Sequence, residues 1–366
     1  MLIGIDASRA NIPERTGVEW YGYHLIKAFA KLDRKNEYRL YVREPLRKDL
    51  RDLPDNFVPV VVPGQRLWTY WALSRELRRN PVDTLFVPSH TVPLVHPRRT
   101  VVTVHDVGFR KFKRNYRRAH YLSLALGTKW SVRRASTVVV PSRTVARELG
   151  TAYDLPASKV AVVPNGFDPD AFSGITASRV AEVMKHHRIK DPYLLFTGRL
   201  ELRKNVSRII EAFYRLRDSG LFGGQLVLVG NPGLGYEEIR RLIIKRPVPD
   251  YVVHTGYLPD DERAALLKGA RGLVFPSLHE GFGIPILEAF AAGTPVITAD
   301  RGATKEVAGT AALLVDPESV ESIHHGMEQI LADTGPAPRL VAAGTQRVRQ
   351  FGWDKTALQI LEILTK

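Results

Sequence analysis

Two carboxylates, Glu280 and Glu288, stand on either side of a glycine-bearing turn in the second half of this 366-residue chain. The turn follows an apolar run that is typical of a buried strand, and Pro285 suits the first turn of a helix. We therefore expect a helix over residues 285–292 that ends at Gly293. Glu280 would then lie in the preceding loop and Glu288 on the helix.

Gly281 and Gly283 leave the backbone N–H groups of this turn bare at the N-terminus of the expected helix. Such N–H groups, together with the helix dipole, favour an anion such as a diphosphate. A carboxylate beside that anion would be repelled, so Glu280 is better placed to bind sugar hydroxyls and Glu288 to bind a ribose diol. The alternative is an ordinary glycine turn flanked by two solvated glutamates.

A second group of charged residues follows the strand expected at 193–197. Arg199 and Lys204 would stand at the carboxyl end of that strand and beside a helix capped by Asn205, where phosphate binding is electrostatically favourable. Taken alone, they are also compatible with ordinary surface cations. With the glycine turn, they form two cationic arms and a helix end that converge on one anion.

The first half of the chain offers fewer chemical groups. His105 and Asp106 directly follow an expected strand. His105 could donate a hydrogen bond to a bound sugar, or it could be a buried imidazole that is bonded within the protein. Ser142 is best interpreted as a helix cap, with a substrate contact as the second interpretation. The loop that ends at Gly17 is a candidate acceptor-side loop.

Short apolar runs alternate with amphipathic stretches along the whole chain, which is typical of β-α units around a parallel sheet. In the first half, we expect strands at 2–5, 38–42, 84–87, 101–104 and 137–140. A second series is expected at 193–197, 225–229, 252–254, 272–275, 295–298 and 312–315. The fold class is therefore α/β, with two Rossmann-like domains. Their ligands bind outside the carboxyl ends of strands, so the expected site is a cleft between the domains.

Residues 164–169 separate the two series and contain two prolines and an Asn-Gly pair, which favour a turn. We take this segment as the hinge. It predicts domains over 1–168 and 169–345, with residues 346–366 forming a C-terminal helix that packs back toward the first domain.

The composition excludes several classes of protein. The chain has no cysteine, which rules out disulfides, thiolate catalysis and cysteine-ligated metal sites. No apolar stretch approaches the roughly 18 residues needed to cross a bilayer, and no signal peptide is visible. We therefore expect a cytoplasmic protein, or one that is peripheral on the inner face of the membrane.

The net charge of +15 is concentrated in residues 1–170, which carry +13 of it. The densest cluster of positive charge has three possible interpretations: it binds a nucleic acid, it binds an anionic membrane, or it is only solvated. Few aromatic side chains are interleaved with these cations, so we expect no nucleic-acid partner. In the membrane hypothesis, segment 110–134 contacts an anionic bilayer, and Tyr121, Leu122 and Trp130 enter the interface. In the alternative, the cations are solvated and the apolar residues face the core. The six cations that begin this segment are Arg110, Lys111, Lys113, Arg114, Arg117 and Arg118.

Taken together, these residues resemble the GT-B glycosyltransferases of family 4, a large group of retaining, nucleotide-sugar-dependent enzymes. The resemblance covers nearly the whole chain and is strongest in the second domain. It is carried by His105-Asp106, Pro164-Asn165-Gly166, Gly198-Arg199-Leu200 with Lys204-Asn205, Glu280 and Glu288, Val307-Ala308-Gly309 and Leu314-Val315-Asp316-Pro317.

The resemblance implies a role for each of these positions. Arg199 and Lys204 would bind the diphosphate, Glu280 the donor sugar, Glu288 the ribose, and His105 the sugar from across the cleft. The catalytic group would be His105, Glu280, Arg199 and Lys204. The remaining donor-binding positions would be Gly17, Gly198, Gly256, Tyr257, Leu258, Gly281, Phe282, Gly283 and Ile284, with the base near the backbone of residues 256–258. Asp106 and Ser142 would lie on the acceptor side.

The implied reaction transfers a sugar to a hydroxyl of a glycan or glycolipid with retention of configuration. Mannose from GDP-mannose is the first choice of donor, and UDP-glucose and UDP-N-acetylglucosamine are the rivals. No cofactor or metal is expected, because two cations and a helix end can stabilise a departing diphosphate.

Two other classes of protein remain as alternatives. A nucleotide-sugar epimerase of similar fold would need no acceptor, but the arrangement of Arg199, Lys204 and Glu280 argues against it. A basic nucleic-acid-binding module is the non-enzymatic alternative. Asp168 and Asp170 resemble a metal-binding Asp-x-Asp motif, but their proline-rich surroundings favour a turn.

Overall fold

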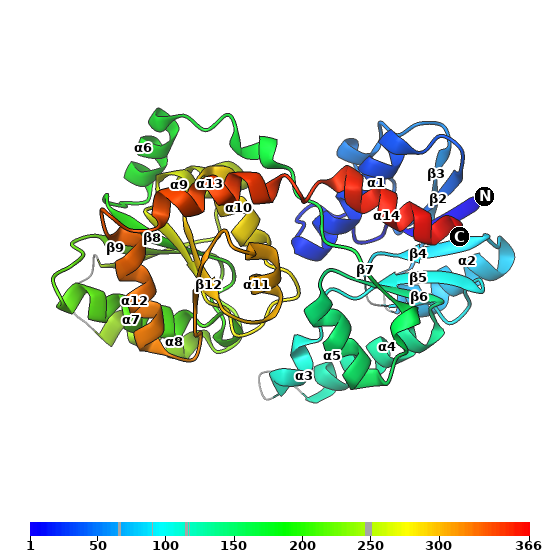
Figure 1. Cartoon of the computed structure of the whole chain (residues 1–366). Coiled ribbons are helices and arrows are strands. Elements are labelled where there is room, and N and C mark those ends of the chain that lie inside the picture. The colour runs from blue at the N-terminus through cyan, green and yellow to red at the C-terminus, as the bar shows by residue number, and fades with distance from the viewer. Residues whose placement is uncertain (65–66, 90, 114–115, 117, 246–250) are drawn as a thin grey trace. The chain divides into compact units, whose positions relative to one another are not determined.

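The computed structural model describes residues 1–64, 67–89, 91–113, 116, 118–245 and 251–366. The chain divides into two compact units (Figure 1). Unit 1 consists of Met1–Gly166 together with Phe351–Lys366, and unit 2 consists of Phe167–Gln350. The first boundary falls two residues before the predicted position at 168, and the second falls five residues after the predicted position at 345.

In the described part of unit 1, seven strands form a parallel sheet in the order β3-β2-β1-β4-β5-β6-β7. The strands are β1 (Leu2–Asp6), β2 (Glu37–Val42), β3 (Phe57–Val61), β4 (Thr84–Val87), β5 (Arg99–Thr103), β6 (Thr137–Val140) and β7 (Val160–Val162). The helices are α1 (Gly17–Leu32), η1 (Lys48–Leu50), η2 (Thr69–Leu73), α2 (Ser74–Arg79), α3 (Gly108–Lys111), α4 (Arg118–Arg134), α5 (Arg143–Tyr153), η4 (Ala157–Lys159) and α14 (Trp353–Thr365).

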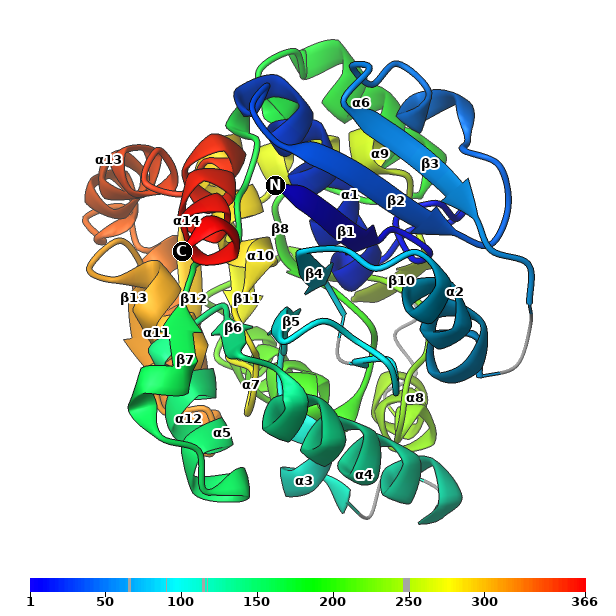
Figure 2. The ribbon, with the colours of Figure 1, turned by 90° about the vertical axis from the view of Figure 1, so that its right-hand side faces the viewer.

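Helices cover both faces of this sheet (Figures 1 and 2). On one face, α1 and α14 bury Leu25 and Ile360 in one hydrophobic cluster. On the other, α2, α4 and α5 contribute Leu77, Val132 and Val145 to a second cluster. A parallel sheet that is covered on both faces needs strands with near-continuous apolar runs, and this is the pattern that predicted most of them.

The last helix, α14, belongs to unit 1 and lies beside α1 (Figure 1). Lys31 of α1 pairs with Asp354 at 2.6 Å, and the Thr84 hydroxyl of β4 donates to the carbonyl of Leu364. Trp353 begins the helix against Gly166, the last residue of the long segment of unit 1. The two points at which the chain leaves and re-enters unit 1 are therefore packed against each other.

In the described part of unit 2, six strands form a second parallel sheet in the order β10-β9-β8-β11-β12-β13. The strands are β8 (Tyr193–Thr197), β9 (Gln225–Val229), β10 (Val252–Gly256), β11 (Gly272–Phe275), β12 (Val296–Ala299) and β13 (Leu313–Val315). The helices are η5 (Pro169–Phe172), α6 (Ala177–His186), η6 (Leu202–Lys204), α7 (Val206–Asp218), α8 (Tyr236–Lys245), α9 (Asp260–Gly269), α10 (Ile284–Ala292), α11 (Gly302–Ala308), α12 (Val320–Leu331) and α13 (Ala337–Val348). Leu195 of β8 pairs with Val227 on one side and Leu273 on the other, so β8 and β11 form the centre of the sheet.

A search of the described residues finds no helix with both the length and the apolar character to span a bilayer.

Replacing Gly166 with alanine is expected to destabilise unit 1. A Cβ there would lie 2.4 Å from Cδ2 and 2.6 Å from Cα of Trp353, and the backbone atom cannot yield without moving the start of α14. Overpacking of this kind lowers the free energy of unfolding by about 1–3 kcal/mol. All five tryptophans of the chain lie in unit 1, so tryptophan fluorescence during denaturant unfolding reports on this unit.

Gly150→Ala in α5 is the matched control, since its Cβ would meet its nearest neighbour at an ordinary 3.8 Å. This variant should unfold at the same denaturant concentration as the wild type or slightly above it. Equal midpoints for Gly166→Ala and the wild type would contradict the close packing.

Candidate active site

In unit 2, the chain runs from β8 through β9 to β10 at one edge of the sheet, and later from β11 through β12 to β13 at the other edge. The strand order therefore reverses between the neighbouring strands β8 and β11. Ligands of open α/β sheets bind at such a reversal, outside the carboxyl ends of the strands. The loop after β8 carries Arg199 and Lys204, and the loop after β11 carries Glu280. The structure therefore places these three predicted residues on neighbouring loops at one edge of the sheet.

Two glycines allow the loops after β8 and β9 to approach closely. Gly198 and Gly230 have φ of 134° and 139°, a region that favours glycine. A Cβ on Gly230 would lie only 2.1 Å from the carbonyl oxygen of Gly198, so no side chain fits there. A Cβ on Gly198 would meet the end of the Lys204 side chain at 3.6 Å. The lysine therefore lies across Gly198, the first residue after β8.

Lys204 and Glu280 form the central ion pair of this site. The Nζ of Lys204 lies 2.7 Å from Oε1 of Glu280, and both side chains are only about a tenth exposed. Arg203 contacts the other carboxylate oxygen at 3.3 Å and is itself paired with Glu201 at 2.8 Å. Sequence reasoning assigned Glu280 a role toward sugar hydroxyls and no partner within the protein, whereas its carboxylate contacts two cations.

The electrostatics of the pair follow from its partners. Burial alone would raise the pKa of Glu280, but the charges of Lys204 and Arg203 outweigh burial and hold this pKa below its ordinary value of 4.5. The carboxylate is therefore ionised throughout the neutral range. The stability that the pair contributes is complete above the unfolded pKa and is lost as the pH falls through the folded pKa.

Arg203 also holds the second loop through its backbone and its side chain. Its carbonyl accepts a hydrogen bond from the N–H of Leu278 at 2.9 Å, and its guanidinium donates to the carbonyl of His279 at 3.2 Å. Together with its contact to Glu280, these bonds fix three consecutive residues against η6. Sequence reasoning missed Arg203, although its position beside Lys204 in the same cationic loop was a usable signal.

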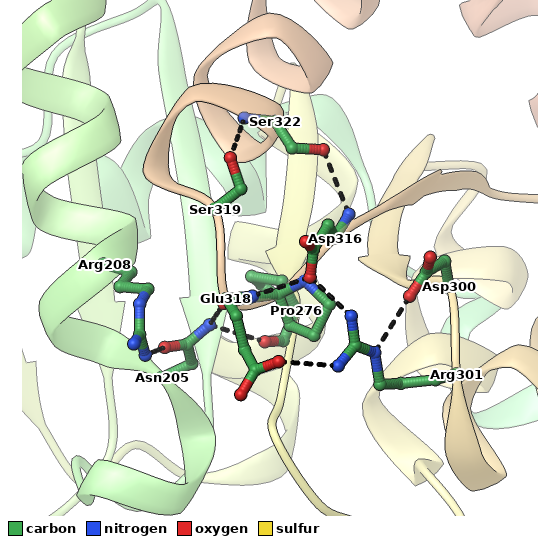
Figure 3. A network of polar contacts seen from close by, with 10 residues as sticks. Asn205, Arg208, Pro276, Asp300, Arg301, Asp316, Glu318, Ser319 and Ser322 are labelled. Atoms are coloured by element: carbon green, nitrogen blue, oxygen red, sulfur yellow. Dashed lines mark hydrogen bonds and ion pairs between the residues drawn. The ribbon is translucent and has the colours of Figure 1, made fainter.

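Asn205, at the end of the loop after β8, connects this loop to the segments that follow β11 and β13 (Figure 3). Its φ is 65°, and its side-chain amide donates to the carbonyls of Pro276 at 3.0 Å and Pro317 at 2.6 Å. The amide oxygen accepts from Arg208 at 2.9 Å. Asn205 occupies the predicted cap position of α7, but its side chain makes no capping bond and instead joins the ends of β11 and β13. The prediction of a capping side chain was wrong for this reason.

Figure 3 also shows a second cation at the neighbouring edge of the sheet. Arg301 contacts Asp300 at 3.1 Å, Asp316 at 2.5 Å and Glu318 at 2.8 Å, and so bridges the segments after β12 and β13. Its side chain is 47% exposed, which limits the stabilisation that these pairs provide. The network connects the loop after β12 to the loop after β13, beside the site.

The expected glycine turn leads into α10. Gly283 has φ 121° and directly precedes the helix, which begins at Ile284 and carries Pro285 in its first turn. Gly281 and Phe282 are both buried in this turn. The turn therefore has the predicted form, with the N-terminus of a nine-residue helix directly after Glu280.

Glu288 is buried on α10 and paired. Its Oε1 accepts from Arg263 of α9 at 2.8 Å, and its carboxylate raises the pKa of that guanidinium. Arg263 follows the predicted base-binding segment 256–258 by five residues. Sequence reasoning missed it, because a charged residue in a polar stretch carries no signal of its partner.

Segment 256–258 lies at the end of β10. The carbonyl of Gly256 accepts from the N–H of Gly230 at 2.7 Å, which brings this segment to the same edge of the sheet as Gly198. Tyr257 is 65% exposed, while Leu258 is buried. The segment therefore presents its backbone and one aromatic ring at this edge.

The predicted residues of unit 1 have partners within that unit. The Nε2 of His105 lies 2.8 Å from the carbonyl oxygen of Pro88, which follows β4, and its ring packs edge-on against Tyr21. Asp106 accepts from the N–H of Gly108 at the start of α3, and Ser142 accepts from the N–H of Val145 as the cap of α5. The loops after β1 and β4 flank the reversal of strand order in this sheet.

Gly17 is the first residue of α1 and follows Thr16, which caps the helix. Thr16 and Glu19 form a reciprocal capping box, and Glu19 also pairs with Arg9 at 3.0 Å. The candidate acceptor-side loop is thus held to the start of α1 by Glu19.

Asp168 accepts a hydrogen bond from the N–H of Asp170 at 3.0 Å and caps η5. This geometry is that of a turn, and it agrees with the interpretation of the sequence. Among the residues that the structure describes, no cluster of three or more histidine, aspartate or glutamate side chains has a geometry that could hold a metal ion.

Comparisons with known proteins agree with this fold. A family model for "Glycosyl transferases group 1" matches residues 181–347, and a model for "Glycosyltransferase Family 4" matches residues 15–171. These two matches, on two units that each hold a parallel sheet, define a glycosyltransferase of the GT-B fold. The chain belongs to the family-4-like glycosyltransferases of this fold.

Relatives from Escherichia coli are similar in sequence. O-antigen chain mannosyltransferase B is 26% identical over 72% of this chain and 69% of its own length. Serotype-specific mannosyltransferase WbdA is 28% identical over 78% of this chain, which spans only 34% of WbdA. Among solved structures, Anabaena Alr3699/HepE in complex with UDP and glucose is 18% identical, with a TM-score of 0.73 over 100% of this chain and 99% of that one.

Arg203→Ala is expected to lower the rate of transfer by roughly tenfold or more. The change removes one of the two cations beside Glu280 and a bond to the 278–280 loop, and a hydrogen bond to a charged group contributes about 1.5–3 kcal/mol. It should also raise the pKa of Glu280, so the acid limb of the pH–rate profile moves to higher pH. The measurement is the release of nucleoside diphosphate across the pH range.

Arg203→Lys keeps the positive charge, so the acid limb of its pH–rate profile should lie close to that of the wild type. Arg215→Ala removes an exposed arginine of α7 that pairs with exposed Glu321, and it serves as the control. If the Arg203→Ala profile coincides with that of Arg215→Ala, Arg203 does not position Glu280.

Proposed function

We propose that the chain transfers mannose from GDP-mannose to a hydroxyl of a glycan or a lipid-linked glycan. The observation that carries the proposal is the Lys204–Glu280 pair on the loops that meet at the strand reversal, next to Arg199. The name of the E. coli O-antigen chain mannosyltransferase supports the choice of sugar. UDP-glucose and UDP-N-acetylglucosamine are the alternative donors, and the ligands of the Anabaena protein favour the former of these two.

Charge balance indicates which cation would meet the donor diphosphate first. Lys204 is paired with Glu280, and Arg203 is paired with Glu201. Arg199 is exposed and makes no ion pair with a described carboxylate. We assign the diphosphate to Arg199 and the N-terminus of α10, with Lys204 shared between Glu280 and a phosphate oxygen.

The carboxylates would orient the rest of the donor. An ionised carboxylate offers about four acceptor positions, so Glu280 can bind sugar hydroxyls while it contacts Lys204 and Arg203. Glu288 would bind the ribose diol, with its carboxylate oriented by Arg263. Segment 256–258 would meet the base, and His105 of unit 1 would contact the transferred sugar.

The proposed reaction retains the anomeric configuration. The bond between the anomeric carbon and the diphosphate oxygen breaks while the acceptor hydroxyl attacks the same face of the sugar. The hydroxyl proton passes to an oxygen of the departing diphosphate, whose growing charge is stabilised by Arg199 and Lys204. We place the reaction in the cytoplasm, with an acceptor carried on a lipid reached at the inner face of the membrane.

Arg199→Ala is expected to lower kcat/KM by on the order of a hundredfold without loss of stability. The side chain is exposed, so its removal leaves no buried charge unpaired. Loss of one contact to the developing charge costs about 3 kcal/mol. Initial rates with GDP-mannose and an oligosaccharide acceptor would measure this change.

Lys204→Ala should lower the rate at least as much, but it should also lower the unfolding temperature, because the buried carboxylate of Glu280 loses its nearest partner. Lys185→Ala, an exposed lysine of α6, is the matched control. Near-normal turnover in both Arg199→Ala and Lys204→Ala would contradict the assignment of the diphosphate.

The proposal needs no cofactor, since arginine, lysine and a helix end supply the positive charge. Activity is therefore expected to survive EDTA. Rates should be compared for chelated enzyme with and without added Mg²⁺ or Mn²⁺. Activity that is lost on chelation and restored by either ion would overturn this part of the proposal and return Asp168 and Asp170 to consideration.

A further inference from the structure

The outer face of α4 carries two exposed leucines between cations. Arg118, Leu122, Leu126, Lys129 and Arg133 follow one another at spacings of three or four residues, so they lie along one stripe of the helix. All five are exposed, with Leu122 at 54% and Leu126 at 64%. A stripe of this kind places apolar side chains in water unless another surface covers it.

The opposite face of α4 packs into unit 1. Val132 is fully buried, Tyr121 packs edge-on against Phe109, and the Trp130 indole donates to the carbonyl of Val92 at 3.1 Å. Tyr121 and Trp130 are thus partly buried against the core cluster. That these two side chains enter a membrane interface stays a prediction, and Leu122 and Leu126 are more exposed than either of them.

The charge around this stripe has a single sign. No aspartate or glutamate occurs in residues 107–147, which hold eleven lysines and arginines. Arg118, Lys129 and Arg133 form no ion pair with any carboxylate that the structure describes. Arg114 and Arg117, which belong to the same basic segment, lie outside the described residues. The surface is therefore complementary to a partner that carries negative charge and also offers an apolar environment for leucine side chains.

An open depression of about 530 Å³ lies along the second half of the stripe. Leu126 and Trp130 supply its apolar lining, and Lys129, Arg133 and Arg134 supply its cations. The guanidinium of Arg134 lies over the Trp130 ring at 4.6 Å from its centre. Apolar and cationic groups in one shallow site match an amphiphile with an anionic head.

Two segments that contact α4 or its neighbour η2 add further exposed apolar side chains. A Cβ on Gly127 would lie 3.2 Å from the Tyr70 hydroxyl, so η2 lies against α4. The residue after Tyr70, Trp71, is 62% exposed, and Leu94 in the neighbouring loop is 41% exposed. Figure 2 shows α4 on the face of the sheet opposite α1.

We propose that this face of α4 docks on the surface of an anionic lipid bilayer. Leu122 and Leu126 would enter the interface, and Arg118, Lys129 and Arg133 would meet the lipid headgroups. A nucleic acid would satisfy the cations but leave the leucines in water. The docking surface would bring a lipid-linked acceptor to the enzyme, and in this respect alone the inference rests on the proposed function.

Co-sedimentation with vesicles tests the docking. The wild-type protein should bind vesicles that contain phosphatidylglycerol, bind pure phosphatidylcholine vesicles at least tenfold more weakly, and dissociate as the salt concentration rises. Each cation near an anionic surface strengthens binding roughly fivefold. Lys129→Glu with Arg133→Glu should therefore weaken binding by at least about 25-fold. Leu122→Ser with Leu126→Ser should weaken it by about tenfold or more.

Matched controls make the same changes on other surfaces. Lys185→Glu with Arg339→Glu, and Leu221→Ser with Leu358→Ser, alter exposed residues that do not belong to α4 and should bind within twofold of the wild type. Transfer to a soluble acceptor should be unchanged in every variant, which separates a failure of docking from a failure of the proposed function.

Three outcomes would overturn the docking proposal. The first is wild-type protein that stays in the supernatant with anionic vesicles at low salt. The second is equal binding to neutral and anionic vesicles. The third is tight binding of an oligonucleotide that the charge variants abolish and the leucine variants leave unchanged, which would identify a nucleic acid as the partner of this face.

Discussion

The ion pair between Lys204 and Glu280 is the interaction on which the site depends. It joins the loop after β8 to the loop after β11, which are neighbours because their strands are adjacent and parallel. Removing one partner of such a buried pair typically costs about 3–5 kcal/mol, because the other charge is left without compensation. Arg203 and Asn205 reinforce the same junction through bonds to the 276–280 segment. The loops that hold the charged groups are therefore rigidly connected, which is a requirement for electrostatic catalysis.

The same pair decides how charge is distributed at this edge of the sheet. Glu280 compensates Lys204 and Glu201 compensates Arg203, so an incoming diphosphate would meet Arg199 and the start of α10 as the remaining positive groups. A second buried pair, Arg263 with Glu288, connects α9 to α10 and fixes the far end of the site. In the proposed function, this arrangement links the local packing of unit 2 to the chemistry of a departing diphosphate.

Much of the fold could be predicted from the sequence, because the central strands are continuous apolar runs and α10 begins with proline after a glycine turn. The strands β3 and β7 were missed. β3 contains Pro59 and exposes Val58 and Val61, and β7 has only three residues, so neither shows the pattern of a buried strand. The types of the site residues were also readable, but their partners were not. That Glu280 faces Lys204, that Asn205 bonds to two carbonyls and that Arg263 holds Glu288 depend on side-chain directions across strands distant in sequence.

The central claim is that the edge of unit 2 around Lys204 and Glu280 binds a nucleotide sugar. Scanning calorimetry with a panel of nucleotide sugars tests it most directly, since a ligand that binds only the folded form raises its stability. The tryptophans all lie in unit 1, so a rise in the calorimetric transition that tryptophan fluorescence does not follow would assign binding to unit 2. We expect one nucleotide sugar, GDP-mannose as the first choice, to raise the transition temperature of the wild type more than the others do. Arg199→Ala should lose most of this rise in transition temperature. A panel in which no nucleotide sugar moves either transition would contradict the account.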